Sequence, residues 1–272
     1  MITRILHFSD LHFGARDDPA FQQAIGAFAA QVQPELIVAT GDLTNRGRPA
    51  QHDRAAAFLR GLGAPVVAVP GNHDIPYTFP ARFTRPWRQF DRLWETTEPV
   101  YSTGAVHLVG VNSVRPWRHQ SGGVDDAQLA RVAERLALAP AGTLRVVALH
   151  HQLIGAPWRT RKKPVARRNH VLASLVDSGA ELIIGGHIHQ GTVSERHEFE
   201  VLDDGARGVV VSIAPGLGRP RPHRRGEACG CVAYRADDES ITVETSIWGG
   251  GEWKLTATRT FPRAFPRGRK RS

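Results

Sequence analysis

The sequence predicts an α/β fold in which two β-sheets pack together and are flanked by helices. Up to Gly191, apolar strand-like runs alternate with helix-like segments, a pattern typical of a mostly parallel sheet with helical crossovers. After Gly191 the helical patterns stop, and short strand-like segments follow one another through turns. This second part predicts an antiparallel sheet packed on the first.

Each element follows from its local pattern. Six runs rich in β-branched residues end in polar residues and glycine, at residues 4–14, 35–47, 64–74, 105–114, 144–152 and 181–191. Because these runs are almost continuously apolar, we expect strands covered on both faces. Alanine- and leucine-rich periodicity predicts helices at residues 19–32, 49–62, 125–138 and 166–178. Later strands are expected at residues 199–202, 206–216, 230–236, 240–248 and 253–261.

The bulk composition is that of a globular protein without a membrane span. The chain has 272 residues, 41% of them hydrophobic, and no apolar run approaches 18 residues. The first residues lack the pattern of a secretory signal, so we expect a cytoplasmic protein. The only two cysteines, Cys229 and Cys231, are too few for a structural zinc site and are interpreted as small strand residues.

The formal net charge of +9 indicates an anionic partner, but its distribution is uneven. The last eleven residues hold five basic residues and no acid. We therefore expect a single domain over residues 1–261 and a basic, disordered tail over residues 262–272. Whether the tail is only solvated or attracts nucleic acid or anionic lipid stays open. The sequence predicts no obligate nucleic-acid partner, leaves peripheral membrane contact open and does not define the oligomeric state.

Polar residues end each of the six predicted strands. In open α/β sheets, ligands bind beyond the carboxyl ends of the strands. Six of the 13 histidines fall at these ends. The full set of strand-end residues is Asp10, His12, Asp42, Asn72, His73, Asp74, Asn112, His150, His151, His187 and His189.

The chemistry of this set predicts a metal site. Carboxylates, an amide and imidazoles without any thiolate suit divalent Mn, Fe, Zn or Co. The i, i+2 spacing of Asp10 with His12, and of His187 with His189, places each pair on one face of an extended chain. The ligands are too many for one tetrahedral ion, whereas two ions bridged by one carboxylate would use them all.

Five short blocks of the sequence resemble, in order, those of the calcineurin-like metallophosphoesterases. They read SDLHFG, GDLTNRG, GNHD, LHH and GHIH and extend from Asp10 to His189. The resemblance implies a four-layer α/β/β/α sandwich of two mixed sheets flanked by helices, and a centre of two divalent metal ions.

The resemblance also implies a role for each residue of these blocks. Asp10, His12 and His189 would hold one metal, and Asn72, His150 and His187 the second, with Asp42 as the bridge. His150 is preferred over His151, although the doublet leaves the second histidine open as a structural or substrate-side residue. His73 would face the substrate phosphate and assist the leaving oxygen, with Asp74 orienting it.

The expected reaction is hydrolysis of a phosphodiester by metal-activated hydroxide, with a cyclic nucleotide or another small phosphodiester as the favoured substrate. A rival hypothesis is a hydrolase of a lipid-linked pyrophosphate of the UDP-2,3-diacylglucosamine type. For it, the aromatic segment at residues 75–94 could form an acyl groove, or else a packed flap. Nuclease activity and a scaffold without catalysis are less favoured hypotheses. The basic loops at residues 159–168 and 219–225 either rim the site or are simply solvated.

Overall fold

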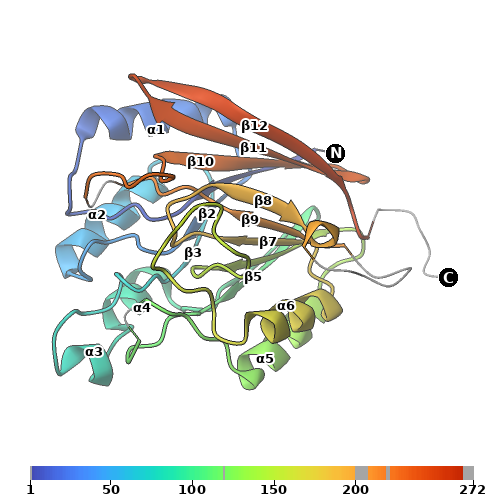
Figure 1. Ribbon diagram of the computed structural model, residues 1–272, viewed down its shortest axis with the longest axis horizontal. Coiled ribbons are helices and arrows are strands. Elements are labelled where there is room, and N and C mark those ends of the chain that lie inside the picture. Colours follow the sequence, from blue (N-terminus) through green and yellow to red (C-terminus); the bar gives the residue numbers. More distant parts are fainter. Residues whose placement is uncertain (1, 119, 200–207, 219–220, 266–272) are drawn as a thin grey trace.

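The computed structural model describes residues 2–118, 120–199, 208–218 and 221–265, and contains two mixed six-stranded sheets (Figure 1). The first sheet has the order β12 (Glu252–Pro262), β11 (Ser240–Gly249), β10 (Gly230–Ala236), β1 (Thr3–Phe8), β2 (Leu36–Thr40) and β3 (Val66–Val69). The second has the order β4 (Val100–Ser102), β5 (Val106–Val111), β6 (Leu144–Leu149), β7 (Leu182–Gly185), β9 (Val210–Ile213) and β8 (Thr192–Glu195).

Helices cover the outer face of each sheet. Beside the first sheet lie α1 (Pro19–Val32) and α2 (Pro49–Arg60), whose apolar residues share a core cluster with β1 and β2. Beside the second lie α5 (Asp126–Ala137) and α6 (Arg168–Asp177), which pack on β5, β6 and β7. A third cluster fills the space between the sheets and includes Ile5, Val38 and Val146. The predicted four-layer sandwich is thereby confirmed.

The predicted assignment of strands to sheets was wrong. We expected the strands before Gly191 to form one sheet and the later strands the other, but β1–β3 and β5–β7 lie in different sheets. Each sheet is completed by later strands, because β10 pairs antiparallel with β1, and β9 pairs parallel with β7. Apolar patterns report the burial of a strand but not the identity of its neighbours, so the sequence could not separate the two arrangements.

The segment that joins the two sheets contains α3 (Ala81–Thr84) and α4 (Arg88–Trp94). Its second half packs as a flap, because Phe90 is buried in the core cluster of the first sheet. Its first half is different, since Phe79 and Phe83 are exposed. The segment at residues 75–94 is therefore neither a packed flap nor an exposed acyl-binding surface over its whole length.

The remaining differences lie near the carboxyl end. A 3₁₀ helix (Arg196–Glu198) precedes Phe199, and the strand expected at residues 199–202 otherwise falls outside the described residues. The expected tail from residue 262 does not begin there: Pro262 belongs to β12, and buried Arg263 forms an ion pair of 2.9 Å with Glu181. Residues 266–272 lie outside the described residues. No helix in the described part of the chain is long and apolar enough to cross a membrane.

Candidate metal centre

The loops that follow the strands hold unusual backbone conformations where the predicted ligands lie. Eight non-glycine residues of the described chain have positive φ. Five of them are predicted ligands: Asp10 (55°), His12 (51°), Asp42 (50°), His187 (72°) and His189 (59°). Such conformations are costly for residues with a side chain, and they concentrate at functional sites where the surrounding structure enforces them.

Glycines let these loops approach one another closely. A Cβ atom at Gly71 would overlap the backbone amide of Asp42, and one at Gly186 would overlap the hydroxyl of Ser9. Both glycines therefore allow a close approach that any side chain at these positions would prevent. The turn at Gly186 brings His187 next to the loop after β1, and the turn at Gly71 brings Asn72 next to the loop after β2.

Asp10, His12 and His189 form the first cluster, and all three are buried. Nε2 of His189 lies 3.1 Å from Oδ1 of Asp10 and 3.3 Å from Nε2 of His12. Oδ2 of Asp10 accepts hydrogen bonds from the Ser9 hydroxyl (2.7 Å) and the His187 amide (2.8 Å). Oδ1 of Asp10 has no hydrogen-bond partner among the described residues, so one oxygen is anchored and the other faces the histidines.

His150, His187 and Asn72 form the second cluster. Nε2 of His150 lies 3.2 Å from Oδ1 of Asn72 and 3.1 Å from Nδ1 of His187. On its other side, His150 Nδ1 donates to the carbonyl of Thr40 at 2.7 Å, and His187 Nε2 donates to the carbonyl of Gln120 at 3.0 Å. Since a carbonyl only accepts, each outer nitrogen carries a proton and each inner nitrogen can present a lone pair to a metal.

Asp42 lies between the two clusters. Its Oδ1 is 3.5 Å from Nε2 of His150, and its Oδ2 is 3.8 Å from Nε2 of His12. The amide of His73 donates to Oδ1 at 2.8 Å, which sets the rotation of the carboxylate. Each oxygen of Asp42 therefore faces a different cluster.

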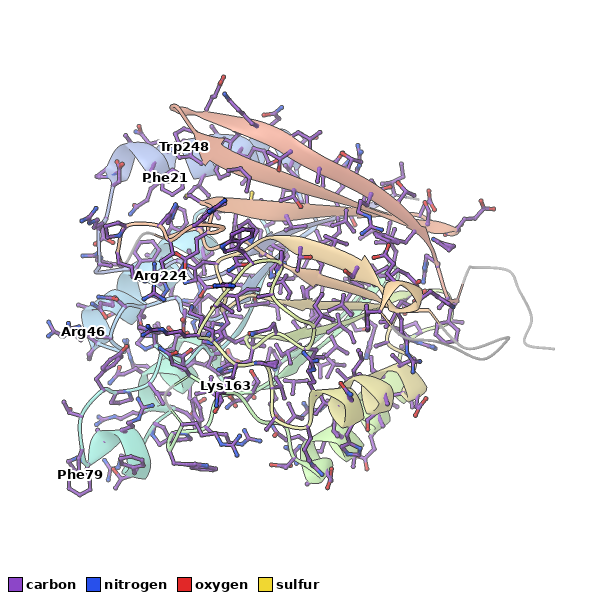
Figure 2. The ribbon with its side chains drawn as sticks, viewed as in Figure 1. Phe21, Arg46, Phe79, Lys163, Arg224 and Trp248 are labelled. Atoms are coloured by element: carbon purple, nitrogen blue, oxygen red, sulfur yellow. The ribbon has the colours of Figure 1, made fainter. Side chains whose placement is uncertain are left out.

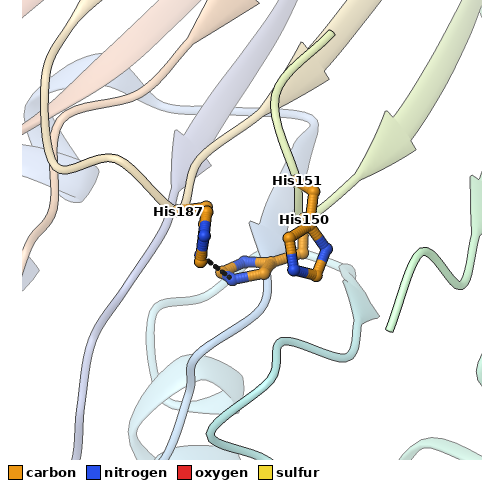
Figure 3. A group of neighbouring side chains, drawn as sticks. All are labelled: His150, His151 and His187. Atoms are coloured by element: carbon orange, nitrogen blue, oxygen red, sulfur yellow. Dashed lines mark hydrogen bonds between the residues drawn. The ribbon is translucent and has the colours of Figure 1, made fainter. Parts of the chain in front are cut away.

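Both residues of the histidine doublet adjoin the second cluster, as Figure 3 shows. The His151 ring lies 4.6 Å from the His187 ring, and its Nε2 is buried with no hydrogen-bond partner in the described structure. Its Nδ1 lies 2.9 Å from the Ser113 hydroxyl. Only His150 also approaches Asn72 and Asp42 within 3.5 Å, which favours it as the ligand.

His73 is next to this centre, but its partners differ from the expected one. The His73 ring lies 4.9 Å from the His12 ring. Its Nδ1 donates to the carbonyl of Asn45 at 2.8 Å and lies 2.8 Å from the Tyr77 hydroxyl. Because Asn45 holds the proton on Nδ1, Nε2 is the nitrogen left for a substrate.

The expected contact of Asp74 with His73 is corrected by the structure. The buried Asp74 carboxylate accepts from the amides of Gly71 (2.8 Å), Thr44 (2.8 Å) and Leu43 (3.2 Å). It turns back towards the loop after β2, because that loop presents several amides without a strand partner. Asp74 therefore braces the two ligand-bearing loops, and the Asn45 carbonyl and Tyr77 orient His73 instead.

Burial and charge set the protonation states. Burial alone would raise the pKa of the Asp42 carboxyl, but His150 and His73 outweigh it, so this pKa lies well below its usual range. Burial lowers the pKa of His12 to about 3 and that of His187 well below its ordinary value. Burial also acts to lower the pKa of His150, but Asp42 raises it to about 9. The donors are ionised carboxylates and mostly neutral imidazoles, which fit divalent cations, and a cation would displace the His150 proton.

Sequence reasoning missed several groups that support the centre. The carbonyls of Thr40, Gln120 and Asn45 have no sequence signal, because every residue carries one. Lys162 contacts the carbonyl oxygen of His187 through its Nζ atom. The sequence indicated Lys162 only as one of several basic residues in the loop at residues 159–168. Figure 2 shows the exposed basic residues Arg46, Lys163 and Arg224 on one side of the molecule.

A sandwich of two mixed sheets whose strand ends gather carboxylates, an amide and imidazoles defines a metal-dependent hydrolase of phosphoesters. A family model described as calcineurin-like phosphoesterase matches residues 3–191, and the chain belongs to this family.

Named relatives agree with this membership. The probable cyclic nucleotide phosphodiesterase syc0937_d of Synechococcus sp. is 29% identical, over 72% of this chain and 77% of that protein. The cAMP/cGMP dual specificity phosphodiesterase MT0825 of Mycobacterium tuberculosis is 27% identical, over 91% of this chain and 80% of that protein. A solved dimetal phosphatase from Danio rerio is similar in fold, with a TM-score of 0.62, 13% identity, and coverage of 96% of this chain and 98% of that chain.

Proposed function

We propose that the chain hydrolyses a small phosphodiester, with a cyclic nucleotide as the favoured substrate, at a centre of two divalent metal ions. Asp10, His12 and His189 would hold one ion, and Asn72, His150 and His187 the other. The observation that carries the proposal is the placement of Asp42. Its two oxygens face the two clusters at 3.8 Å and 3.5 Å, as a bridging carboxylate requires.

Each side chain then has a defined task. Two bound ions would supply Lewis-acid chemistry, lowering the pKa of water towards neutrality and offsetting the charge of the phosphate. His73 would present Nε2 to the departing oxygen, since the Asn45 carbonyl and the Tyr77 hydroxyl hold Nδ1. Asp74 keeps the loops of Asp42 and Asn72 in register, and the His150 and His187 rings are aimed by the carbonyls of Thr40 and Gln120.

The substrate class rests on similarity. The Synechococcus relative is named as a probable cyclic nucleotide phosphodiesterase and the Mycobacterium relative as a cAMP/cGMP phosphodiesterase, and each alignment covers most of this chain. Family membership alone leaves the phosphoester open. We keep manganese, iron, zinc and cobalt as the candidate metals, because the mixed nitrogen and oxygen donors suit all four. A cytoplasmic location is part of the same proposal.

A second candidate is hydrolysis of a lipid-linked pyrophosphate. The observation that favours it is the exposure of Phe79 and Phe83 in the segment that begins directly after Asp74. These side chains could contact an acyl chain, whereas the rest of the segment packs in the core around Phe90.

A panel of substrates tests the proposal. Cyclic AMP, bis(p-nitrophenyl) phosphate, a UDP-diacylglucosamine lipid and single-stranded DNA are incubated with the protein and Mn²⁺. We expect turnover of the first two, abolished by a chelator and restored by added metal. Turnover of the lipid alone would favour the second candidate, and cleavage of DNA alone would favour a nuclease. Two bound metals without hydrolysis of any phosphoester would make the protein a scaffold.

A further inference from the structure

Four large apolar side chains are exposed on two neighbouring segments, the one that contains α3 and the one around Trp117, which Arg82 holds together. The exposed fractions are 45% for Tyr77, 82% for Phe79, 54% for Phe83 and 68% for Trp117. We call these four residues the aromatic patch. Exposed aromatic groups gathered in one place are characteristic of an interaction surface, because a solvated surface gains nothing from them.

Arg82 joins the two segments that carry the aromatic patch. Although charged, its side chain is buried, and its guanidinium donates to three carbonyl oxygens. These belong to Pro116 (2.7 Å), Pro76 (3.3 Å) and Arg118 (3.4 Å). Trp117 lies between two residues whose carbonyls are held in this way. The position of Trp117 beside α3 is therefore built into the fold.

The surroundings of the aromatic patch are positively charged. Residues 75–94 contain four arginines and a single acid, Asp91. The tetrapeptide Arg-Pro-Trp-Arg stands at residues 85–88, and it occurs again at residues 115–118, around Trp117. Arg85 and Arg88 are exposed. Aromatic side chains combined with arginine are the composition of elements that lie in the interface of an anionic membrane.

The shape of this region favours a bilayer over other anionic partners. α3 lies at the periphery of the molecule, and Phe79 points away from its body (Figures 1 and 2). A single nucleic-acid strand is held in a groove that follows its backbone. A projecting phenylalanine instead suits insertion between lipid headgroups.

The aromatic patch is connected directly to the catalytic histidine of the proposed reaction. The hydroxyl of Tyr77 lies 2.8 Å from Nδ1 of His73. Tyr77 is thus the member of the aromatic patch that contacts the site, and a membrane that covered Tyr77 would lie next to His73.

We propose that the aromatic patch docks the protein on an anionic phospholipid bilayer and thereby presents the metal centre to phosphoesters at the membrane surface. The second half of this statement rests on the proposed function. The docking itself does not, and it is measurable without turnover.

The test is sedimentation of the full-length protein with vesicles of phosphatidylcholine alone or with added phosphatidylglycerol. Phe79→Ser combined with Trp117→Ser is the test variant. Leu138→Ser is the matched control, because Leu138 is 78% exposed at the end of α5, outside the aromatic patch. Circular dichroism checks that all three proteins are folded. We expect them to be, because the replaced side chains are exposed.

We expect the wild type and the control to bind the phosphatidylglycerol vesicles, and salt to weaken the binding. The affinity of the double variant for these vesicles should be at least about tenfold lower, because the two aromatic side chains that would be buried on binding are absent. Equal binding to both vesicle types, or equal binding by the double variant, would overturn the docking. So would a dimer of the wild type that dissociates in the double variant, because the aromatic patch would then be a self-interface. A wild-type protein that binds the vesicles but does not hydrolyse soluble diesters would instead contradict the proposed function.

Discussion

The backbone amide of His187 donates a hydrogen bond of 2.8 Å to Oδ2 of Asp10. Asp10 follows β1 in the first sheet and His187 follows β7 in the second, so this bond fastens the two sheets at their carboxyl ends. It also commits Oδ2 and leaves Oδ1 facing His189. Two predicted ligands of the metal centre therefore contribute to the contact between the sheets, which couples metal binding to stability.

Removal of metal should lower the thermal stability. Asp10 and Asp42 are both buried and lie with His150 in one group whose ligand atoms are within 4.8 Å of one another, so bound cations would offset two nearby negative charges. A ligand present at a hundred times its Kd stabilises a fold by about 2.7 kcal/mol. We expect EDTA to lower the Tm by about 5–10 °C and Mn²⁺ to restore it, as measured by differential scanning fluorimetry. An identical Tm with EDTA and with Mn²⁺ would contradict metal binding at these carboxylates.

Asp42→Asn should remove metal and activity together. The change deletes the charge of the residue whose oxygens face both clusters. We expect the metal content by mass spectrometry to fall from about two ions per chain to about one or less. Turnover should fall more than about a hundredfold, beyond the usual effect of a residue that only supports a ligand. The control is Asp91→Asn, at an exposed position on α4, which should match the wild type in metal content and turnover. Two ions retained in Asp42→Asn would refute Asp42 as the bridging ligand.

His73→Ala and His150→Ala should separate catalysis from metal binding. His73 lies beside His12 and Asp42 but commits Nδ1 to the Asn45 carbonyl. His150 instead lies 3.2 Å from Asn72. We expect His73→Ala to retain both metals and lose about 10²- to 10⁴-fold in kcat. His150→Ala should lose metal. Metal loss in His73→Ala would place this histidine among the ligands instead.

Lys162→Met should weaken the binding of phosphate. The Lys162 ammonium contacts the His187 carbonyl, so it adds a positive charge beside the second cluster, where phosphate would be attracted. Loss of one charged hydrogen bond to phosphate is expected to raise the inhibition constant of inorganic phosphate about tenfold or more. Lys163, the exposed neighbour, supplies the control: Lys163→Met should change the inhibition constant of phosphate less than about twofold. An unchanged constant in Lys162→Met with full metal content would rule out this contact.

His7 should make stability depend on pH. His7 bonds Thr40 (2.8 Å) and Tyr234 (3.0 Å) of the two neighbouring strands in the first sheet, and burial lowers its pKa to about 3. Between about pH 6.5 and 3 only the unfolded chain binds this proton. The free energy of unfolding should therefore fall with decreasing pH in this window, by up to about 1.4 kcal/mol per pH unit from His7. Urea titrations of His7→Gln should show a shallower slope; an equal slope would exclude His7 as the cause.

Much of the candidate site was predictable from local pattern. Polar residues directly after apolar runs identified Asp10, Asp42 and Asn72, because a strand end is a short-range feature of the chain. Groups that act through the backbone were not predictable. The Asn45 carbonyl, rather than Asp74, orients His73. Because every residue has a backbone carbonyl, the residue type at position 45 does not indicate this role.

The sequence by itself determined which residue types stand at which strand end, and hence the donor chemistry and the family. Only the tertiary structure decided that β1–β3 and β5–β7 form separate sheets, and that the two oxygens of Asp42 face opposite clusters. It also placed Trp117 beside α3 through the buried Arg82. The physical reason is that strand pairing and contacts between distant loops depend on long-range packing. The periodicity of a segment reports only its own burial.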